Sequence, residues 1–416
     1  MKFVISSSVL SARLQSIGRV IAAKTTMPIL NCFVFDIKSK RLELTAADNE
    51  ITLRTYIDLV ESDADIRFAV NAKTIQDAIK EIPEQPLEIF VNESNMEITV
   101  EYQNGKYNFM AESADEYPIP PALNEETMHV NITSGHLLNA INRSLFAAAN
   151  DPLRPVMNGI YFDLKTSGLT MVASDGQKMA CNTLVDIKVE KPGSFILPQK
   201  PATLLKNILG KEEDTIDMAF DGRRAVFKGT NFEMNCRLTE GRFPNYAGVI
   251  PQDNPNIISV NREALIAALR RVLIFSNAVS SLVKLNIDNG KMRISSQDTD
   301  YSMSAEENLL CDYSGTPIKI GYRGPFLLEL LNNLQIADKK ALAFVALSGI
   351  AGALSWLFYF MALKEGTVTQ VAPIDKLSVV FAVAIAVLFF DEKVSFLHGI
   401  AIAMIAAGGL LLAIFP

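Results

Sequence analysis

Apolar residues in the first 335 positions follow helical spacing in some stretches and strand spacing in others. The first helical stretch has a stripe of residues three or four positions apart, made of Leu10, Leu14, Ile17 and Ile21. Alternating runs such as 33–37 are typical of half-buried strands. The pattern predicts six helices, at residues 8–24, 71–82, 134–150, 199–211, 261–277 and 321–334.

The pattern is an internal repeat. Residues 28–36, Pro-Ile-Leu-Asn-Cys-Phe-Val-Phe-Asp, return as Pro-Val-Met-Asn-Gly-Ile-Tyr-Phe-Asp at 155–163, an offset of 127 positions. An aspartate recurs once per copy at the end of a strand-like run, at Asp48, Asp175 and Asp298. Each copy begins with a strand and a helix and continues with strands, which predicts an α+β domain given three times. Proline-rich 116–126 and residues 242–255 are interpreted as linkers.

The end of the chain has a different character. At the spacing of the repeat the third copy should run to about residue 380, but its closing strands are replaced by an uncharged apolar run. Three stretches, 341–363, 368–390 and 397–415, are long and apolar enough to cross a bilayer as helices. We therefore predict a truncated third domain followed by a three-helix, all-α transmembrane tail. The predicted domains are 1–122, 128–252, 256–336 and 341–416.

The chain has few residues that could support catalysis. Its three histidines and four widely spaced cysteines make a metal or proton-relay site difficult to build, and the cysteines are interpreted as reduced thiols. The motifs of serine hydrolases, zinc proteases and nucleotide-binding folds are absent from the sequence. The repeated aspartate is either a catalytic group or, as we favour, a turn former that bonds nearby backbone. We predict that the protein is not an enzyme and needs no cofactor.

Charge is distributed unevenly between the predicted helices and the remainder. The six helical stretches carry a combined formal charge of +9 in a chain whose net charge is −7. Positive charge gathered on one structural layer suits a surface that faces a polyanion, although exposed helix faces also carry Lys and Arg in ordinary proteins. Because no base-reading motif is present, contact with duplex DNA would be to phosphates and independent of sequence.

Four segments together resemble the bacterial DNA polymerase III β subunit, the sliding clamp, over residues 1 to about 335. They are Lys-Thr-Thr-Met-Pro-Ile-Leu at 24–30, Arg-Pro-Val-Met-Asn-Gly at 154–159, Ala-Ser-Asp-Gly-Gln-Lys-Met-Ala at 173–180, and Glu-Gly-Arg-Phe-Pro-Asn-Tyr at 240–246. The resemblance implies a head-to-tail homodimer of three-domain subunits around duplex DNA, with helices lining the hole and sheets outside. Such a protein is a processivity factor that tethers the replicative polymerase.

The resemblance also implies residue roles. It places Lys24 at a DNA-contacting loop, and the charges of the helices add Arg13, Arg19, Arg143, Lys200 and Lys206 as DNA-binding candidates. A pocket for peptide motifs of the polymerase and the clamp loader is expected at Met157, Ser174, Gly176, Gln177, Lys178, Met179, Pro244, Gly248 and Val249. The apolar members suit a hydrophobic anchor, or they are ordinary core. The family's C-terminus, which forms part of this pocket, is missing, so we expect impaired partner binding and ring closure.

From about residue 340 the chain resembles the C-terminal helices of an EamA-type drug/metabolite transporter, on segments such as Val-Ala-Pro-Ile-Asp-Lys-Leu-Ser at 371–378. The alternative function is therefore a membrane protein of the transporter type that carries a clamp-derived cytoplasmic domain. We expect a cytoplasmic body and, through the tail, association with the membrane. Lys339 and Lys340, just before the first span, fit the bias of positive charge toward the cytoplasmic side.

Overall fold

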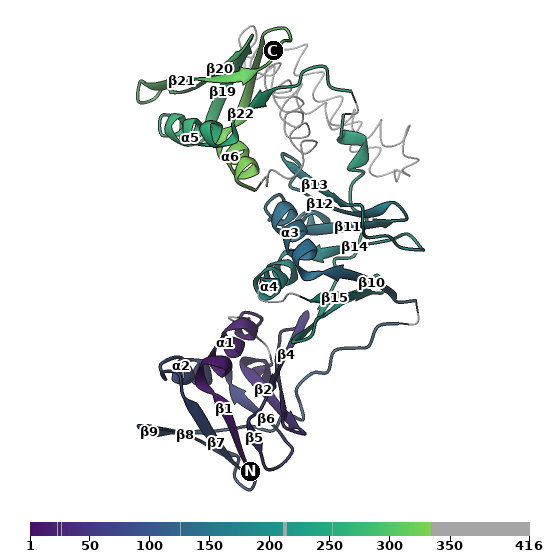
Figure 1. Cartoon of the computed structure of the whole chain (residues 1–416), viewed down its shortest axis with the longest axis vertical. Coiled ribbons are helices and arrows are strands. Elements are labelled where there is room, and N and C mark those ends of the chain that lie inside the picture. The colour runs from purple at the N-terminus through teal and green to yellow at the C-terminus, as the bar shows by residue number, and fades with distance from the viewer. Residues whose placement is uncertain (23, 26, 125, 211–213, 252, 334–416) are drawn as a thin grey trace, which may run out of the picture. The chain divides into compact units, whose positions relative to one another are not determined.

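The computed structural model describes residues 1–333 except 23, 26, 125, 211–213 and 252. The chain divides into two compact units, Met1–Val249 and Ile250–Pro416. Figure 1 shows the ribbon of both units, each of which is described by itself below. The predicted membrane spans and the predicted closing part of the third domain lie outside the described residues. Of the helices that the structure does describe, none combines the length and apolar character needed to cross a bilayer.

Unit 1 contains two copies of one strand–helix pattern. The first copy comprises β1 (Lys2–Ser6), α1 (Ser7–Gly18), β2 (Cys32–Lys38), β3 (Arg41–Ala47), β4 (Ile51–Asp58), β5 (Glu61–Ser62), β6 (Ile66–Asn71), α2 (Ala72–Lys80), β7 (Pro86–Asn92), β8 (Glu97–Tyr102) and β9 (Gly105–Met110). The second comprises β10 (Met128–Thr133), α3 (Ser134–Leu145), β11 (Gly159–Lys165), β12 (Gly168–Ser174), β13 (Met179–Leu184), β14 (Gly193–Pro198), α4 (Gln199–Leu209), β15 (Thr215–Phe220), β16 (Arg224–Lys228) and β17 (Phe232–Arg237). Short 3₁₀ turns lie at Pro28–Asn31, Pro155–Met157 and Ala247–Val249. The predicted repeat is thus the repeat of the fold.

Unit 2 contains the first part of a third copy. It comprises β18 (Ser259–Val260), α5 (Arg262–Leu273), β19 (Leu282–Asp288), β20 (Lys291–Asp298), β21 (Met303–Asp312), β22 (Ile318–Arg323) and α6 (Gly324–Asn333). The strands form one sheet in the order β18-β21-β20-β19-β22. Its own core is centred on Leu269, Val272 and Ile294, which are fully buried between α5 and the sheet.

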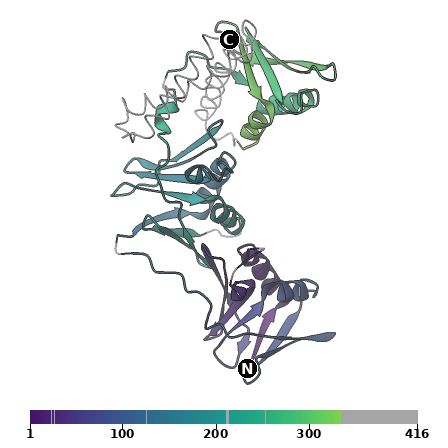
Figure 2. The ribbon, with the colours of Figure 1, turned by 180° about the vertical axis from the view of Figure 1, so that it is seen from behind.

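Each domain packs a pair of helices against sheets, α1 with α2 and α3 with α4 (Figure 1), an arrangement that Figure 2 shows from behind. Strand and helix meet at a polar capping residue in most copies. The side chains of Ser6, Asn71, Thr133 and Asn261 each accept a hydrogen bond from a backbone amide three residues on. The predicted stripe is buried at Leu10, Leu14 and Ile17, while Ile21 lies beyond the end of α1 and is half-buried.

The helices are shorter than predicted at their C-terminal ends. The stretch predicted at 8–24 ends at Gly18, and that predicted at 134–150 ends at Leu145. Arg19 and Lys24 therefore lie in the loop that follows α1 rather than on the helix. Apolar spacing continued past these ends because residues beyond a helix also pack on the core, as Val20 does. All of the helices except α6 still carry net positive formal charge.

The repeated aspartate forms the same turn in all three copies. One carboxylate oxygen of Asp48 accepts hydrogen bonds from the amides of residues 50 and 51, at 2.8 and 2.7 Å. Asp175 does the same for residues 177 and 178, and Asp298 for residues 300 and 301. A carboxylate that closes an Asx turn between two strands explains the conservation of the position between copies. The interpretation of this residue as a turn former is confirmed.

An eight-stranded sheet crosses from the first domain to the second, in the order β10-β15-β16-β17-β4-β3-β2-β6. The connection is the antiparallel pair of β17 with β4, in which Phe232 lies opposite Thr55 and Glu233 opposite Arg54. Arg54 and Glu233 form an ion pair at 3.3 Å across this joint. One buried cluster runs through both domains as a consequence, which explains why the two copies form a single compact unit.

The four cysteines are free thiols, as predicted. Cys32 and Cys236 are buried, and burial raises the pKa of the Cys236 thiol to about 12, so it is unreactive at neutral pH. Cys181 is exposed on β13. The segment interpreted as a linker at residues 242–255 is partly ordered core, because Phe243 is buried in it.

Candidate peptide-binding and DNA-facing sites

The turn between β12 and β13 carries four of the predicted pocket residues. The hydroxyl of Ser174 donates to the carbonyl of Lys178 at 2.8 Å and accepts from the amide of Gly176 at 3.1 Å. Asp175 accepts from the amides of Gln177 and Lys178, both at 2.8 Å. Gly176 has a φ of +86°, a conformation that other residues rarely adopt. The turn is therefore held rigidly, with Gln177 exposed.

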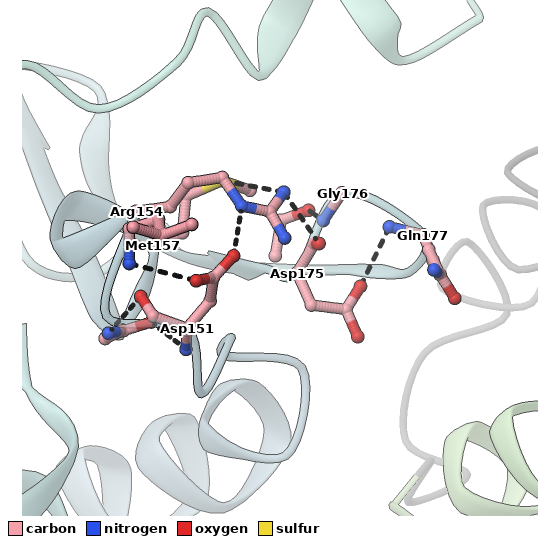
Figure 3. Close-up of polar contacts among 9 residues, drawn as sticks. Asp151, Arg154, Met157, Asp175, Gly176 and Gln177 are labelled. Atoms are coloured by element: carbon pink, nitrogen blue, oxygen red, sulfur yellow. Dashed lines mark hydrogen bonds and ion pairs between the residues drawn. The ribbon is translucent and has the colours of Figure 1, made fainter.

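Arg154 ties this turn to the segment before β11 (Figure 3). Its Nε donates to Asp151 at 2.8 Å, and its Nη1 donates to the carbonyl of Asp175 at 3.3 Å. The same Nη1 lies 3.9 Å from the sulfur of Met157. The hydrogen bond with Arg154 is the main cause that lowers the pKa of the Asp151 carboxyl. Sequence reasoning quoted Arg154 as a motif residue but missed this role, because its acceptor is a backbone atom 21 residues away.

An apolar cluster lies behind the turn. Val172, Ile196 and Phe243 are buried in it, and Val156, Tyr161, Met179 and Tyr246 pack against them. The rings of Tyr161 and Phe243 are stacked, with centroids 4.8 Å apart and planes 1° from parallel. Residues from the 155–157 turn, strands β11–β14 and the 243–246 segment thus meet on the face of one sheet. Because Met179 borders this cluster, an apolar side chain of a partner would find a matching surface here.

A polar triad fixes the 243–246 segment to β11. The hydroxyl of Tyr246 donates to Asp163 at 2.6 Å and accepts from Lys165 at 3.3 Å. Lys165 also pairs with Asp163 at 2.8 Å, and hydrogen bonding to this carboxylate raises the pKa of Lys165. Burial, followed by the bond to Asp163, raises the pKa of Tyr246 to about 12. The phenol is therefore protonated at neutral pH and serves as a donor.

The nine predicted pocket residues divide by exposure. Met157 and Lys178 are buried, at 9% and 8% exposure, and Ser174 and Met179 are half-buried. Pro244, Gly248 and Val249 are exposed, Val249 at 67%. The predicted set therefore forms a buried edge and an exposed rim on the second domain. Whether it binds a peptide stays a prediction.

The first domain contains a similar apolar cluster at the matching position. There Leu30, Cys32, Val34, Ala47 and Ala69 form the equivalent cluster, and Tyr117 covers it at 4% exposure. The Tyr117 hydroxyl bonds the carbonyl of Cys32 at 3.4 Å, and burial raises the pKa of Tyr117. A separate cavity of about 420 Å³ lies between the end of α1 and the start of α2, where Gly18, Asn71 and Gln76 line it. None of the predicted peptide-site residues borders that cavity.

The predicted DNA-contacting residues fall into two groups. Lys24, Arg19 and Lys206 are exposed. Arg13 and Arg143 are half-buried. Together they come from the helix layer of unit 1, on α1, α3, α4 and the loop after α1. Their contact with DNA stays a prediction.

Lys200 has protein partners. Its ammonium group donates to the carbonyl of Val20 at 2.7 Å and to a carboxylate oxygen of Asp48 at 2.5 Å. Because Lys200 opens α4 and both acceptors lie in the first domain, the residue fixes the seam between the two domains. Its side chain keeps 43% exposure, so the charge still adds to the field beside Arg19. Among the described residues no group of three or more His, Cys, Asp or Glu side chains is arranged to hold a metal ion.

Comparison with known proteins places these features in a family. Three models of the DNA polymerase III beta subunit match in order, the N-terminal domain at residues 1–121, the central domain at 131–245 and the C-terminal domain at 247–345. The EamA-like transporter family matches residues 320–414, overlapping the end of the third clamp model.

Curated relatives and solved structures agree with the first three matches. The beta sliding clamp of Bacillus subtilis is 25% identical over 348 residues, which cover 81% of this chain and 92% of the relative. That of Haemophilus influenzae is 27% identical, covering 80% and 91%. A crystal structure of the DNA polymerase III beta subunit from Thermotoga maritima has a TM-score of 0.73 at 26% identity, covering 80% of this chain and 90% of that one. The Pseudomonas aeruginosa sliding clamp bound to griselimycin has a TM-score of 0.76 at 24% identity, covering 80% and 90%, and supports the fold alone.

The repeated domain, the sheet that joins two copies and three consecutive family matches lead to one conclusion: over residues 1–345 the chain belongs to the DNA polymerase III beta subunit family, and its C-terminal part matches the EamA-like transporter family.

Proposed function

We propose that the clamp part of this chain is a processivity factor, which encircles duplex DNA and tethers the replicative DNA polymerase. The observation that carries the proposal is the run of three family matches, in order, on a fold in which β17 of one domain continues the sheet of the domain before it. A ring made of such joints holds DNA without a tight contact. The work of the protein is therefore to raise the polymerase's effective concentration at the primer end, without catalysis of its own.

The joint inside unit 1 suggests how two copies would meet as a homodimer. β9 is the repeat equivalent of β17, 127 positions earlier, and β21 is the equivalent of β4. Transferring the β17·β4 register places Lys106 of one copy opposite Glu306 of the other. The outer edge of β21 is unpaired over residues 303–310 within the described residues. Opposite charges directly across a strand pair stabilise it, as Arg54 and Glu233 do within the chain.

Contact with DNA would be made by the positive helix layer and the loop that carries Lys24 and Arg19. Lysine and arginine that meet phosphates release counterions, and such binding does not depend on sequence. The chain's net charge of −7 keeps the rest of the surface repulsive to DNA, so the attraction is confined to this layer. A mobile, weakly held duplex is what a sliding ring requires.

Partners would bind at the apolar cluster beside the β12–β13 turn. The exposed rim of Pro244 and Val249 and the half-buried Met179 form an apolar surface, and the rigid turn at Ser174–Gln177 presents polar backbone beside it. An extended peptide with one or two large apolar side chains matches this combination. The polymerase and the clamp loader are the expected carriers of such peptides.

The C-terminal part supports a second candidate, a membrane protein of the drug/metabolite transporter type with a clamp-derived cytoplasmic domain. The EamA-like match over residues 320–414 and the three long apolar stretches favour it. In either case we expect the tail to bring the chain to a membrane. Separating cells that express the full chain into membrane and soluble fractions tests this. Recovery of the chain in the soluble fraction as a stable dimer would contradict it.

The decisive test of the clamp function is topological. The full chain is loaded by a bacterial clamp loader onto nicked circular DNA and then separated from free protein by gel filtration. A clamp stays with the circle and is lost when a restriction enzyme linearises it. Equal retention on circular and linear DNA would show ordinary binding and would refute the proposal. Stimulation of long-product synthesis by the polymerase on primed circular DNA is the second readout.

A further inference from the structure

Strand β13 is an edge strand whose equivalent in the first domain is covered. The four-stranded sheet has the order β13-β12-β11-β14, so β13 has one neighbour within the described residues. At every position from Met179 to Leu184 it is more exposed than the matching residue of β4, 127 positions earlier. Leu53 is 0% exposed and its equivalent Ala180 is 9% exposed, while Thr55 is 3% exposed and its equivalent Asn182 is half-buried.

The third clamp match ends before the segment that would supply a strand to cover β13. β4 is covered by β17, the closing strand of the next domain. The corresponding strand of the third domain would fall near residues 355–360, as far beyond Asp298 as β17 lies beyond Asp175. The third clamp model ends at residue 345, before this position, and the EamA-like match runs through it. Within the described residues β13 is therefore an acceptor edge without a donor strand.

The described part of the chain includes one strand of the donor type with an open edge. β9 has six residues, as β17 does, and lies at the end of the sheet β5-β1-β7-β8-β9. Tyr107 and Phe109 on β9 already pack on the core, which leaves the backbone edge outward. An unpaired edge with alternating inward apolar residues is a ready template for pairing with another chain.

We propose that β13 accepts β9 of a second copy of this chain, as an antiparallel pair with the register of β17·β4. That register places Lys106 opposite Cys181, Tyr107 opposite Ala180 and Gly105 opposite Asn182. None of these pairs sets like charges against each other, and the large Tyr107 meets the small Ala180. The pairing joins unit 1 of one copy to unit 1 of the next, without using the third domain. The inference rests on the proposed function, since it assumes that joints between copies repeat the joint within the chain.

Two consequences follow for assembly. The described residues of each copy offer one open donor, β9, and two open acceptors, β13 and β21, so the two kinds of joint compete for the same strand. Joints through β13 link unit 1 head to tail. Unit 1 holds two clamp domains, so three copies join six such domains in a row, the number that a dimer of three-domain chains supplies. We therefore expect covalent trapping of the β13 joint to give dimers, trimers and higher species rather than dimers alone.

Cysteine cross-linking on the full chain separates the two joints. Lys106→Cys creates a thiol that the proposed register places beside the native Cys181, within the Cα separation that a disulfide spans. Under oxidation, we expect most of the monomer to be converted into a ladder of disulfide-linked dimers, trimers and higher species on a non-reducing gel. Reductant should return these species to monomer. The control K106C/C181S should lose this ladder, and K106C/C181S/E306C tests the β21 joint.

Each outcome decides between the joints. A ladder with K106C that C181S removes supports pairing on β13. Cross-links only in the variant with E306C would overturn the inference while supporting the proposed dimer. A folded chain, judged by unchanged far-UV circular dichroism, that cross-links through neither pair would overturn both.

Discussion

Removing one oxygen at Tyr246 should loosen the rim of the candidate peptide site without disturbing its apolar floor. Tyr246→Phe keeps the ring, which lies edge-on to Tyr161 at 6.2 Å, and leaves the Tyr161–Phe243 stack intact. It deletes the 2.6 Å bond to Asp163 and the 3.3 Å bond from Lys165. The Asp163–Lys165 pair remains at 2.8 Å, so the carboxylate keeps one charged partner.

The size of the effect follows from these contacts. A hydrogen bond to a charged group contributes about 1.5–3 kcal/mol net, and the surviving Lys165 partner places this loss at the low end, about 1.5 kcal/mol. Because the two joined domains of unit 1 need not unfold in one step, the midpoint of a global unfolding curve would understate this loss of free energy. Amide hydrogen exchange of residues 243–249 measures it locally, and a loss of about 1.4 kcal/mol appears as about tenfold faster exchange.

Peptide affinity gives the functional readout. If the 243–249 segment must be ordered to present Pro244 and Val249, a looser segment costs affinity for a peptide with a large apolar anchor. Fluorescence anisotropy with such a labelled peptide should show weaker binding by Tyr246→Phe, by up to about tenfold. Tyr301→Phe is the matched control, since Tyr301 is 75% exposed and far along the chain in unit 2. Exchange and affinity equal to those of the unmodified chain would refute the reasoning and show that apolar packing alone holds the segment.

Three further predictions test other parts of the account. Between about pH 10 and 12 the folded chain keeps the Tyr246 proton, while the unfolded chain releases it. The free energy of unfolding therefore falls as pH rises through this window. In alkaline denaturation, Tyr246→Phe should remove the part of this fall that Tyr246 causes. Lys206→Glu should lower the slope of log affinity for duplex DNA against log salt by about 0.9 or more, while Lys188→Glu, on an exposed loop outside the helix layer, should leave the slope unchanged in the same titration. Gly159→Ala should lower the free energy of unfolding in urea by about 3 kcal/mol, because its new methyl group overlaps a carbonyl of β14. Gly135→Ala, with open space around it on α3, should not lower it. Equal urea midpoints for the two variants would contradict the close approach of Gly159 to β14.

Local features of the fold could be predicted from the sequence because they depend on neighbours in the chain. The apolar spacing of α1 and the Asx turns at Asp48 and Asp175 involve contacts within a few residues. Helix ends were predicted too late, since residues after a helix can stay buried, as Val20 shows. The sequence had no signal for how far the helical backbone continues into such a segment.

Features that join distant segments could not be derived from residue pattern alone. Lys200 was chosen for its charge, yet its partners Val20 and Asp48 lie 180 and 152 residues away. Arg154 reaches a backbone carbonyl, a group that every residue carries and that no pattern singles out. The family resemblance located the pocket segments, while the structure supplied the contacts that hold them together.

The position of the truncation decides which joint of the proposed ring is affected. In each of the first two domains the acceptor strand (β4 or β13) comes before the second helix, and the donor strand (β9 or β17) is the last strand of the domain. The described part of the third domain includes its acceptor, β21, and the first domain includes its donor, β9. Both strands of the proposed joint between copies therefore lie in the described residues, whereas the third clamp match ends before the segment that would supply a strand to β13. We therefore expect the change of sequence after the third clamp match to affect the β13 edge first, while the β9·β21 joint proposed between copies keeps both of its strands.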